Sequence, residues 1–140
     1  RFARVVGSSG LAIGLDIEDS MVRHMNREAL KLGLDNYVAR TIPTDNPGLD
    51  SGSVDVVFLC NTYHHITNRE EYFRRVAKSL KKDGRLVIVD FYKRELPVGP
   101  PPDHKMAKET VIPEIHSAGF ELVKSHDLLE YQYFLEFKVQ

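Results

Sequence analysis

Polar, acidic and imidazole side chains stand directly after three apolar runs of this sequence. Asp16 ends the first run, Asn61–His65 follows the second, and Asp90 ends the third. A carboxylate at the end of a strand can accept hydrogen bonds from both hydroxyls of a ribose. His64 and His65 carry imidazoles, the side chains most often used as general bases, so either could accept a proton from a nucleophile. These residue types therefore suit binding to the ribose of a nucleotide and the transfer of a proton.

Hydrophobic spacing and turn residues predict the elements that carry these side chains. The expected elements of the first half are a helix over 1–6, a strand over 11–16, a helix from Asp19 or Ser20 to Gly33, a strand over 37–42, a loop over 43–53 and a strand over 54–60. Those of the second half are a helix from Thr67 into 81–84, a strand over 86–89, a proline-rich connection over 96–104 that could act as a lid, a helix from near Thr110 to Gly119, and strands over 120–125 and 131–139.

Local signals refine three of these helices. Asp19 or Ser20 can cap the second helix, and Thr67 with Glu70 makes a capping-box pattern for the third. Pro113 falls inside the last helix, so we expect that helix to start near Thr110 or to kink. The second helix is expected to bury a stripe formed by Met21, Met25, Ala29 and Leu32.

Strands that alternate with helices predict a doubly wound α/β fold with a mostly parallel, Rossmann-like sheet. The alternation of Tyr131, Tyr133, Leu135, Phe137 and Val139 predicts an antiparallel strand, which would close the sheet with the strand before it. Ligands of such sheets bind beyond the carboxyl ends of the strands. The residues at those ends are Asp16, Thr44 with Asp45, 61–65 and 90–93.

Composition excludes several classes of protein. The chain has 140 residues, 42% of them hydrophobic, and a formal net charge of -1, so neither nucleic acid nor an anionic membrane is the expected partner. No apolar run approaches the roughly 20 residues that cross a bilayer. The single cysteine and the six scattered histidines predict neither a disulfide nor a metal site, and they favour a cytoplasmic location.

Four stretches of the chain carry a family resemblance in their order and spacing. They are IGLDIEDSMV (13–22), PGLDSGSVDVVFLCNTYHHI (47–66), LKKDGRLVIVDF (80–91), and SAGFELV with EYQYFLEF (117–123 and 130–137). Together they resemble the class I S-adenosylmethionine-dependent methyltransferases, and among these the small-molecule group that includes the quinone-biosynthesis C-methyltransferases. In that family the last strand lies antiparallel between its neighbours, so the resemblance implies this strand order here.

The resemblance implies cofactor contacts for five residues of the first half. Asp16 would bind the ribose hydroxyls of S-adenosylmethionine, and Ile17 and Met21 would flank the adenine. Thr44 and Asp45 would lie where the family contacts the adenine amine. Simpler roles compete: a helix cap for Asp16, core packing for Ile17 and Met21, and an Asx turn for Asp45.

The second half supplies the remaining candidates. Asn61 follows the strand that, in the family, runs beside the methionine part of the cofactor, although it could instead cap the strand end. His64 and His65 are the candidate catalytic residues, with cofactor or substrate contact as their first role and removal of a proton as their second. Their alternative is structural, because one imidazole often packs into the start of the next helix.

The family's glycine-rich cofactor loop follows its first strand, and no such loop is found here. Gly7-Ser8-Ser9-Gly10 follows an expected helix and precedes an expected strand, which is the reverse order. We therefore expect residues 1–140 to form a single methyltransferase-like domain that is incomplete at its N-terminus. On that expectation the chain as given would be inactive and would hardly fold without the residues before Arg1.

The function implied by the resemblance is transfer of a methyl group from S-adenosylmethionine to a small-molecule acceptor. Two alternatives stay open, a nicotinamide-dependent oxidoreductase and a non-catalytic Rossmann-like binding domain. An oxidoreductase would also place an acid at Asp16, but it would not be expected to end in the strand pair 120–125 and 131–139. The sequence does not identify the acceptor, the methylated atom or the oligomeric state.

Overall fold

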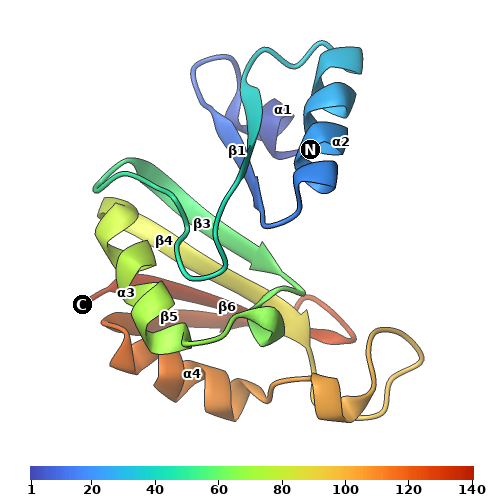
Figure 1. The fold of residues 1–140 in the computed structure, drawn as a ribbon. Coiled ribbons are helices and arrows are strands. Elements are labelled where there is room, and N and C mark those ends of the chain that lie inside the picture. The colour runs from blue at the N-terminus through green and yellow to red at the C-terminus, as the bar shows by residue number, and fades with distance from the viewer. The chain divides into compact units, whose positions relative to one another are not determined.

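The computed structural model describes all 140 residues, which form two compact units. Residues 1–48 make up the first unit and residues 49–140 the second (Figure 1). None of their helices combines the length and the apolar character that crossing a membrane requires.

The first unit is a two-stranded parallel sheet with two helices. Its elements are α1 (Phe2–Val6), β1 (Ala12–Asp16), α2 (Asp19–Lys31) and β2 (Tyr37–Thr41). Strands β1 and β2 are parallel, and Asp16 lies opposite Thr41 at the carboxyl end of the pair. The expected strands over 11–16 and 37–42 are therefore confirmed to within one residue.

Helix α2 differs from its prediction at its start and on its buried face. Glu18 is the N-cap residue, so the expected capping by Asp19 or Ser20 is wrong. The Asp19 carboxylate instead accepts a hydrogen bond from the Thr41 hydroxyl at the end of β2. Val22 and Ala29 are buried, whereas Met21 and Leu32 of the expected stripe are exposed.

The end of α2 agrees with the prediction that Gly33 stops the helix. Gly33 has a φ of 62°. Its N–H donates to the Leu30 carbonyl, and the N–H of Leu34 donates to the Ala29 carbonyl. This pair of hydrogen bonds is a Schellman motif, which glycine favours because it has no Cβ to oppose a positive φ.

The second unit is a four-stranded mixed sheet with the order β3-β4-β6-β5. Its elements are β3 (Val54–Cys60), η1 (Tyr63–His65), α3 (Arg69–Ser79), β4 (Leu80–Phe91), η2 (Pro102–His104), α4 (Lys108–Ser117), β5 (Phe120–His126) and β6 (Gln132–Val139). Strand β3 is parallel to β4, and β6 is antiparallel to both β4 and β5. The predicted α/β class, with parallel pairs and an antiparallel C-terminal pair, is confirmed.

The last strand lies where the family resemblance implied. Strand β6 is inserted between β4 and β5 and runs antiparallel to each. Its alternating pattern predicted one buried face, and Tyr133, Leu135 and Phe137 are 0 to 1% exposed. Their side chains share a face of the sheet because successive residues of a strand point to opposite sides.

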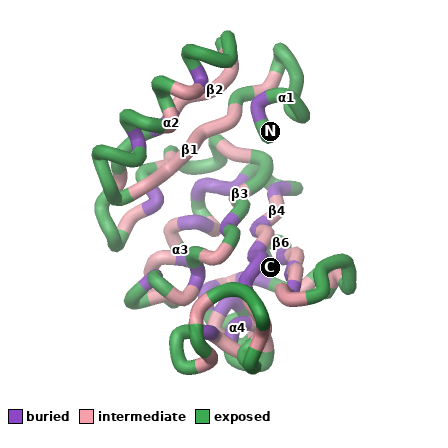
Figure 2. Tube along the Cα trace, turned by 90° about the vertical axis from the view of Figure 1, so that its right-hand side faces the viewer, coloured by how far each residue is buried: buried purple, intermediate pink, exposed green.

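The core of the second unit lies between the sheet and the helices α3 and α4. Phe73 from α3 and Ile115 from α4 pack with Leu86, Ile88 and Leu135 from the sheet. Figure 1 shows both helices on the same face of this sheet, and Figure 2 shows buried residues on the strands and on the sides of the helices. This packing holds the ends of β3 and β4 in a fixed frame.

Several boundaries in the second unit differ from their predictions. The capping box at Thr67 is wrong, because Asn68 is the N-cap of α3 and has a φ of 46° without a side-chain cap. Helix α3 ends at Ser79, and β4 begins at once with Leu80 opposite Val54, followed by a register shift before Arg85.

Helix α4 begins at Lys108, two residues before the expected start, and contains Pro113. Because proline has no N–H, one backbone carbonyl of the helix lacks its hydrogen-bond donor. Pro113 is exposed, so this carbonyl lies near water. The interior proline is therefore tolerated here.

Candidate active site

The first unit places Asp16 at the carboxyl end of β1. Its Oδ1 atom accepts a hydrogen bond of 2.9 Å from the backbone N–H of Glu18. A carboxylate has two oxygens and about four acceptor positions. Asp16 therefore keeps acceptor capacity for a ligand while the turn into α2 fixes its orientation.

Two apolar side chains beside Asp16 are not part of a core. Ile17 is 53% exposed and Met21 is 47% exposed. The alternative role of core packing is therefore wrong for both residues. Exposed apolar side chains next to a carboxylate suit a ligand that has both a flat apolar part and hydroxyl groups.

The loop after β2 carries Thr44 and Asp45, both of which are exposed. The Asx turn in this loop is formed by Asn46, whose Oδ1 accepts a hydrogen bond of 2.9 Å from the N–H of Gly48. The turn role proposed for Asp45 is thus filled by its neighbour. Strands β1 and β2 are parallel neighbours, so this loop leaves the sheet at the same edge as Asp16.

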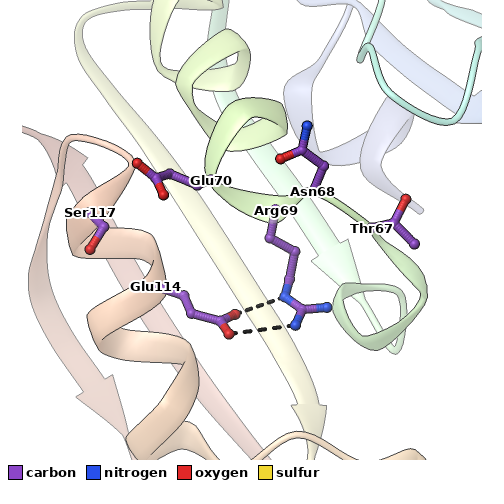
Figure 3. Close-up of a pocket in the computed structure, with 6 residues that line it drawn as sticks. All are labelled: Thr67, Asn68, Arg69, Glu70, Glu114 and Ser117. Atoms are coloured by element: carbon purple, nitrogen blue, oxygen red, sulfur yellow. Dashed lines mark hydrogen bonds and ion pairs between the residues drawn. The ribbon is translucent and has the colours of Figure 1, made fainter.

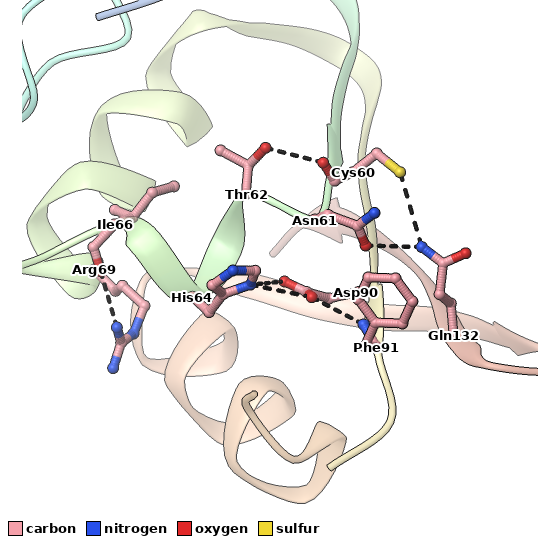
Figure 4. A network of polar contacts seen from close by, with 9 residues as sticks. All are labelled: Cys60, Asn61, Thr62, His64, Ile66, Arg69, Asp90, Phe91 and Gln132. Atoms are coloured by element: carbon pink, nitrogen blue, oxygen red, sulfur yellow. Dashed lines mark hydrogen bonds and ion pairs between the residues drawn. The ribbon is translucent and has the colours of Figure 1, made fainter. Parts of the chain in front are cut away.

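In the second unit Asn61 directly follows β3 with a left-handed backbone, at a φ of 54°. Its N–H donates to the Val89 carbonyl at 2.8 Å, and its Oδ1 accepts from Nε2 of Gln132 at 2.7 Å (Figure 4). Asparagine tolerates this conformation better than most residues. The side chain is therefore held by a strand two positions away in the sheet, with its amide nitrogen directed away from Gln132.

His64 is paired with Asp90, the buried acid near the end of β4. The Nδ1 atom of His64 lies 2.9 Å from Oδ2 and 3.1 Å from Oδ1 of Asp90 (Figure 4). The Asp90 side chain is 0% exposed and that of His64 is 10% exposed. Since the carboxylate occupies Nδ1, the other ring nitrogen of His64 is the one directed away from Asp90.

His65 has a different environment. It is exposed, and its ring lies 4.1 Å from the His64 ring, measured between centroids and tilted by 49°. The structure thus brings the two candidate histidines side by side, and only His64 is held by a carboxylate in a defined orientation.

Tyr63 anchors the short η1 helix that carries both histidines. Its hydroxyl donates to Oε2 of Glu114 at 2.6 Å, and Nε of Arg69 donates to the same oxygen at 2.7 Å. Burial raises the pKa of the Tyr63 hydroxyl, and the hydrogen bond to Glu114 raises that pKa further. The backbone next to His64 is therefore fixed from the α4 side.

A cavity of about 550 Å³ lies beside the contacts of Glu114 with Tyr63 and Arg69, between the start of α3 and the end of α4. Arg69 and Glu114 point toward one another across its wall (Figure 3). Its other lining residues are Thr67, Asn68, Glu70 and Ser117. None of the residues predicted to bind cofactor or to act in catalysis lines it.

The predicted site residues fall into two groups, one in each unit. Asp16, Ile17 and Met21 lie at the junction of β1 and α2, with Thr44 and Asp45 after β2. Asn61, His64 and His65 lie after β3. Asp90 was noted only as a strand-end residue, although an acid at the end of an apolar run is the same signal that singled out Asp16.

Comparison with solved structures shows the fold. A structure described as a SAM-dependent methyltransferase from Aquifex aeolicus matches with a TM-score of 0.94 and 22% identity, over 99% of this chain and 73% of that one. A second, described as the [4+2]-cyclase SpnF, matches with a TM-score of 0.75 and 18% identity, over 89% of this chain and 48% of that one. Because proteins described by different reactions share the fold, the fold alone does not select the chemistry.

Sequence comparison identifies relatives of known type. The ubiquinone/menaquinone biosynthesis C-methyltransferase UbiE of Pasteurella multocida is 33% identical over 100 residues, which cover 66% of this chain and 35% of that protein. The aligned part is thus about a third of that relative's length. A family model described as "Methyltransferase domain" matches residues 1–136, which is nearly the whole chain. The chain therefore belongs to the methyltransferase domain family.

Proposed function

We propose that this chain forms part of an S-adenosylmethionine-dependent methyltransferase that acts on a small-molecule acceptor. The observation that carries the proposal is the junction of β1 and α2, where the Asp16 carboxylate stands beside the exposed side chains of Ile17 and Met21. A carboxylate that accepts hydrogen bonds and two apolar side chains are complementary to the ribose and the adenine of the cofactor. Membership of the family adds to this support.

Each unit carries residues that suit a part of such a cofactor. Asp16 would accept hydrogen bonds from the ribose hydroxyls, Ile17 and Met21 would contact the adenine, and Thr44 with Asp45 would contact its amine. Asn61 would bind the amino acid part through the amide nitrogen that Gln132 does not engage. When bound, S-adenosylmethionine supplies an electrophilic methyl group, so the chain itself needs only to bind, orient and manage a proton.

His64 is the better candidate of the two histidines for that proton. Its Nδ1 is engaged by Asp90, which leaves Nε2 to accept a proton from a hydroxyl, thiol or amine of the acceptor. His65 would contact substrate or cofactor from its exposed position beside the His64 ring.

Calorimetry with S-adenosylhomocysteine tests the cofactor site. We expect Asp16→Asn, in the protein expressed from its complete gene, to weaken binding by at least about tenfold, because each hydrogen bond to a charged group is worth about 1.5–3 kcal/mol. Glu18→Gln is the matched control, since it removes the same charge two residues away from an exposed position. Equal affinities of Asp16→Asn and the wild type would refute the proposed cofactor site.

Transfer of a labelled methyl group separates the proposed reaction from the two alternatives. The protein would be incubated with methyl-labelled S-adenosylmethionine and a panel of phenols, amines, thiols and activated carbon acids. We expect label in at least one acceptor. Binding of a nicotinamide nucleotide in place of S-adenosylhomocysteine would favour an oxidoreductase, and cofactor binding without any transfer would favour a binding domain.

The composition supports two expectations, one about the binding partner and one about the cellular location. The net charge of -1 gives no general attraction for nucleic acid, so the partner would be the small-molecule acceptor alone. The single cysteine suits a reducing compartment, which makes the cytoplasm the expected location. A shift of electrophoretic mobility of DNA or RNA at low salt would contradict the first expectation.

A further inference from the structure

We propose that Asp90 is a positioning residue that holds the His64 imidazole with its proton on Nδ1 and its lone pair on Nε2. This inference rests on the proposed function, because it assigns to Asp90 the task of preparing His64 to accept the acceptor's proton. Asp90 is a buried acid whose side chain reaches the proposed reaction only through His64.

Asp90 is fixed within the frame of the sheet. It lies in β4 with its side chain 0% exposed, and its Oδ1 accepts a hydrogen bond of 2.8 Å from the N–H of Phe91. Strand β4 is held by β3 on one side and by β6 on the other. An acid buried this deeply is rare without a partner, because moving its charge out of water is unfavourable.

His64 is that partner, and the chemistry of the pair selects one tautomer. An ionised carboxylate can only accept hydrogen bonds, so the Nδ1 atom lying 2.9 Å and 3.1 Å from its two oxygens must carry the hydrogen. In the neutral imidazole Nε2 is then the acceptor. Asp90 thus decides which nitrogen of His64 can receive a proton.

No second titratable side chain competes with His64 for the Asp90 carboxylate. Among the described residues, His64 is the only titratable side chain hydrogen-bonded to the Asp90 carboxylate. Tyr133 lies opposite Asp90 in β6, and its hydroxyl is buried without a hydrogen-bond partner. Burial raises the pKa of Tyr133, and the charge of Asp90 raises that pKa further, so this neighbour stays neutral.

The backbone on both sides of His64 is also held, so the ring extends from a fixed position beside Asp90. Tyr63 and Arg69 both hydrogen-bond Glu114 of α4, and the Arg69 guanidinium also donates to the Ile66 carbonyl at 2.8 Å. These contacts fix the residues before and after the histidine pair. Orientation of a base in this way is a recognised source of rate, because no reorganisation is then needed during the reaction.

The lone pair of His64 Nε2 takes the hydrogen of an acceptor O–H, S–H or N–H group, and the electron pair of that bond stays on the acceptor atom. As this atom bonds to the methyl carbon, the bond from that carbon to the sulfonium sulfur breaks, and its electron pair remains on the sulfur of S-adenosylhomocysteine. His64 becomes an imidazolium with hydrogens on both nitrogens, and the Asp90 carboxylate stabilises it. The imidazolium later returns the proton to water.

Nitrogen NMR of histidine-labelled protein tests the tautomer directly. We expect the wild type, saturated with S-adenosylhomocysteine, to show His64 as the Nδ1–H tautomer. In Asp90→Asn the amide can donate as well as accept, so the Nε2–H tautomer should appear, whereas Tyr133→Phe should leave the tautomer unchanged. An Nε2–H tautomer in the wild type would overturn the proposal, even if the variant failed to fold.

A double-mutant cycle on labelled methyl transfer distinguishes positioning from a structural role. Asp90→Asn and His64→Gln should each lower kcat by about a hundredfold or more, with the affinity for S-adenosylhomocysteine unchanged. In the double variant kcat should be that of His64→Gln alone, because Asp90 acts only through His64. Additive losses would overturn the positioning role. Absence of any transfer by a wild type that shows the Nδ1–H tautomer would instead refute the proposed function.

Discussion

At the scale of single residues, the anchor that fixes η1 depends on the ionised form of Glu114. Partial burial raises the pKa of this carboxyl group, but hydrogen bonds from Arg69 and Tyr63 more than offset that effect. The pKa of Glu114 therefore lies below its ordinary value of 4.5. A carboxyl group whose pKa is lowered by folding stabilises the folded state above its unfolded pKa, and this contribution is lost as the pH falls through the folded value.

Replacing the carboxyl group should remove that dependence. We expect the free energy of unfolding of Glu114→Gln, measured by urea denaturation, to fall less steeply than that of the wild type as the pH decreases below about 4.5. Ser117→Ala alters another residue of the same cavity wall without removing a carboxyl group, and it should keep the wild-type dependence. Parallel curves for Glu114→Gln and the wild type would show that the ionised carboxylate does not stabilise the anchor.

The sequence predicted which candidate residues lie at strand ends better than it predicted their partners. Asp16 and Asn61 were found because each follows an apolar run, and runs of apolar residues are visible along the chain. The pairing of His64 with Asp90 joins positions 26 apart, and it depends on the register of β3 against β4. No local pattern reports that register, so one member of the pair was expected to act and the other was noted only for its place.

At the scale of elements, the spacing of apolar residues predicts the type of element more reliably than it predicts which face of that element is buried. On β6 the expected apolar face is buried at Tyr133, Leu135 and Phe137 and is exposed at Val139, the last residue of the strand. In α2 the helical period was recognised, but the buried residues are Val22 and Ala29 and not Met21. A strand has only two faces, so alternation fixes which one is buried. A helix has several neighbouring stripes, and its packing against other elements decides which of them is buried.

The proline-rich connection after β4 is fastened to the strand end through Gly99 and Lys105. Gly99 has a φ of 85°, and a Cβ there would lie 2.8 Å from the Phe91 ring. The Lys105 ammonium, only 1% exposed, donates to the Arg94 carbonyl at 2.9 Å and lies 5.8 Å from the centre of the same ring. The connection thus covers Phe91, the residue that follows Asp90.

Gly99→Ala should therefore destabilise the protein more than an ordinary glycine replacement. Gly52→Ala is the matched control, because its φ of 60° is also positive but nothing lies within 4 Å of its Cβ position. We expect Gly52→Ala to lower the free energy of unfolding by about 1 kcal/mol and Gly99→Ala by about 1–3 kcal/mol more, from the clash with a packed ring. Urea denaturation followed by tyrosine fluorescence measures both. Equal losses would mean that the connection is not packed on Phe91.

Pro113 offers a test of helix α4, in which it removes one backbone hydrogen bond. Pro113→Ala should restore the N–H donor to the Glu109 carbonyl and raise the free energy of unfolding by about 1–3 kcal/mol. His116→Ala, at another exposed position of the same helix, should change it by only a few tenths of a kcal/mol. The same denaturation measurement applies, and a loss of stability in Pro113→Ala would show that the ring itself packs favourably.

At the scale of the whole molecule, buried apolar surface is distributed unequally between the two units. The buried hydrophobic residues of the first unit are small, namely Ala3, Val22, Ala29 and Ala39. Those of the second unit include large side chains such as Phe73 and form one continuous cluster around β4 and β6. Local stability follows the apolar area that each part removes from water. The elements proposed to bind the cofactor's adenosine thus belong to the less stable part.

Hydrogen exchange of the protein expressed from its complete gene would measure this difference and connect it to ligand binding. Amides of β4 and β6 should exchange slowest, and those of β1 and β2 at least about tenfold faster, because a small core permits frequent local opening.

S-adenosylhomocysteine at 100 times its dissociation constant should slow exchange in β1 and at the start of α2 by up to about a hundredfold, since a ligand that binds only the closed form adds about 2.7 kcal/mol to its stability. Asp16→Asn at the same ligand concentration should lose most of this protection and retain that of β4 and β6. Equal protection of the two units without ligand would contradict the unequal cores, and unchanged exchange in β1 with ligand would place the cofactor site elsewhere.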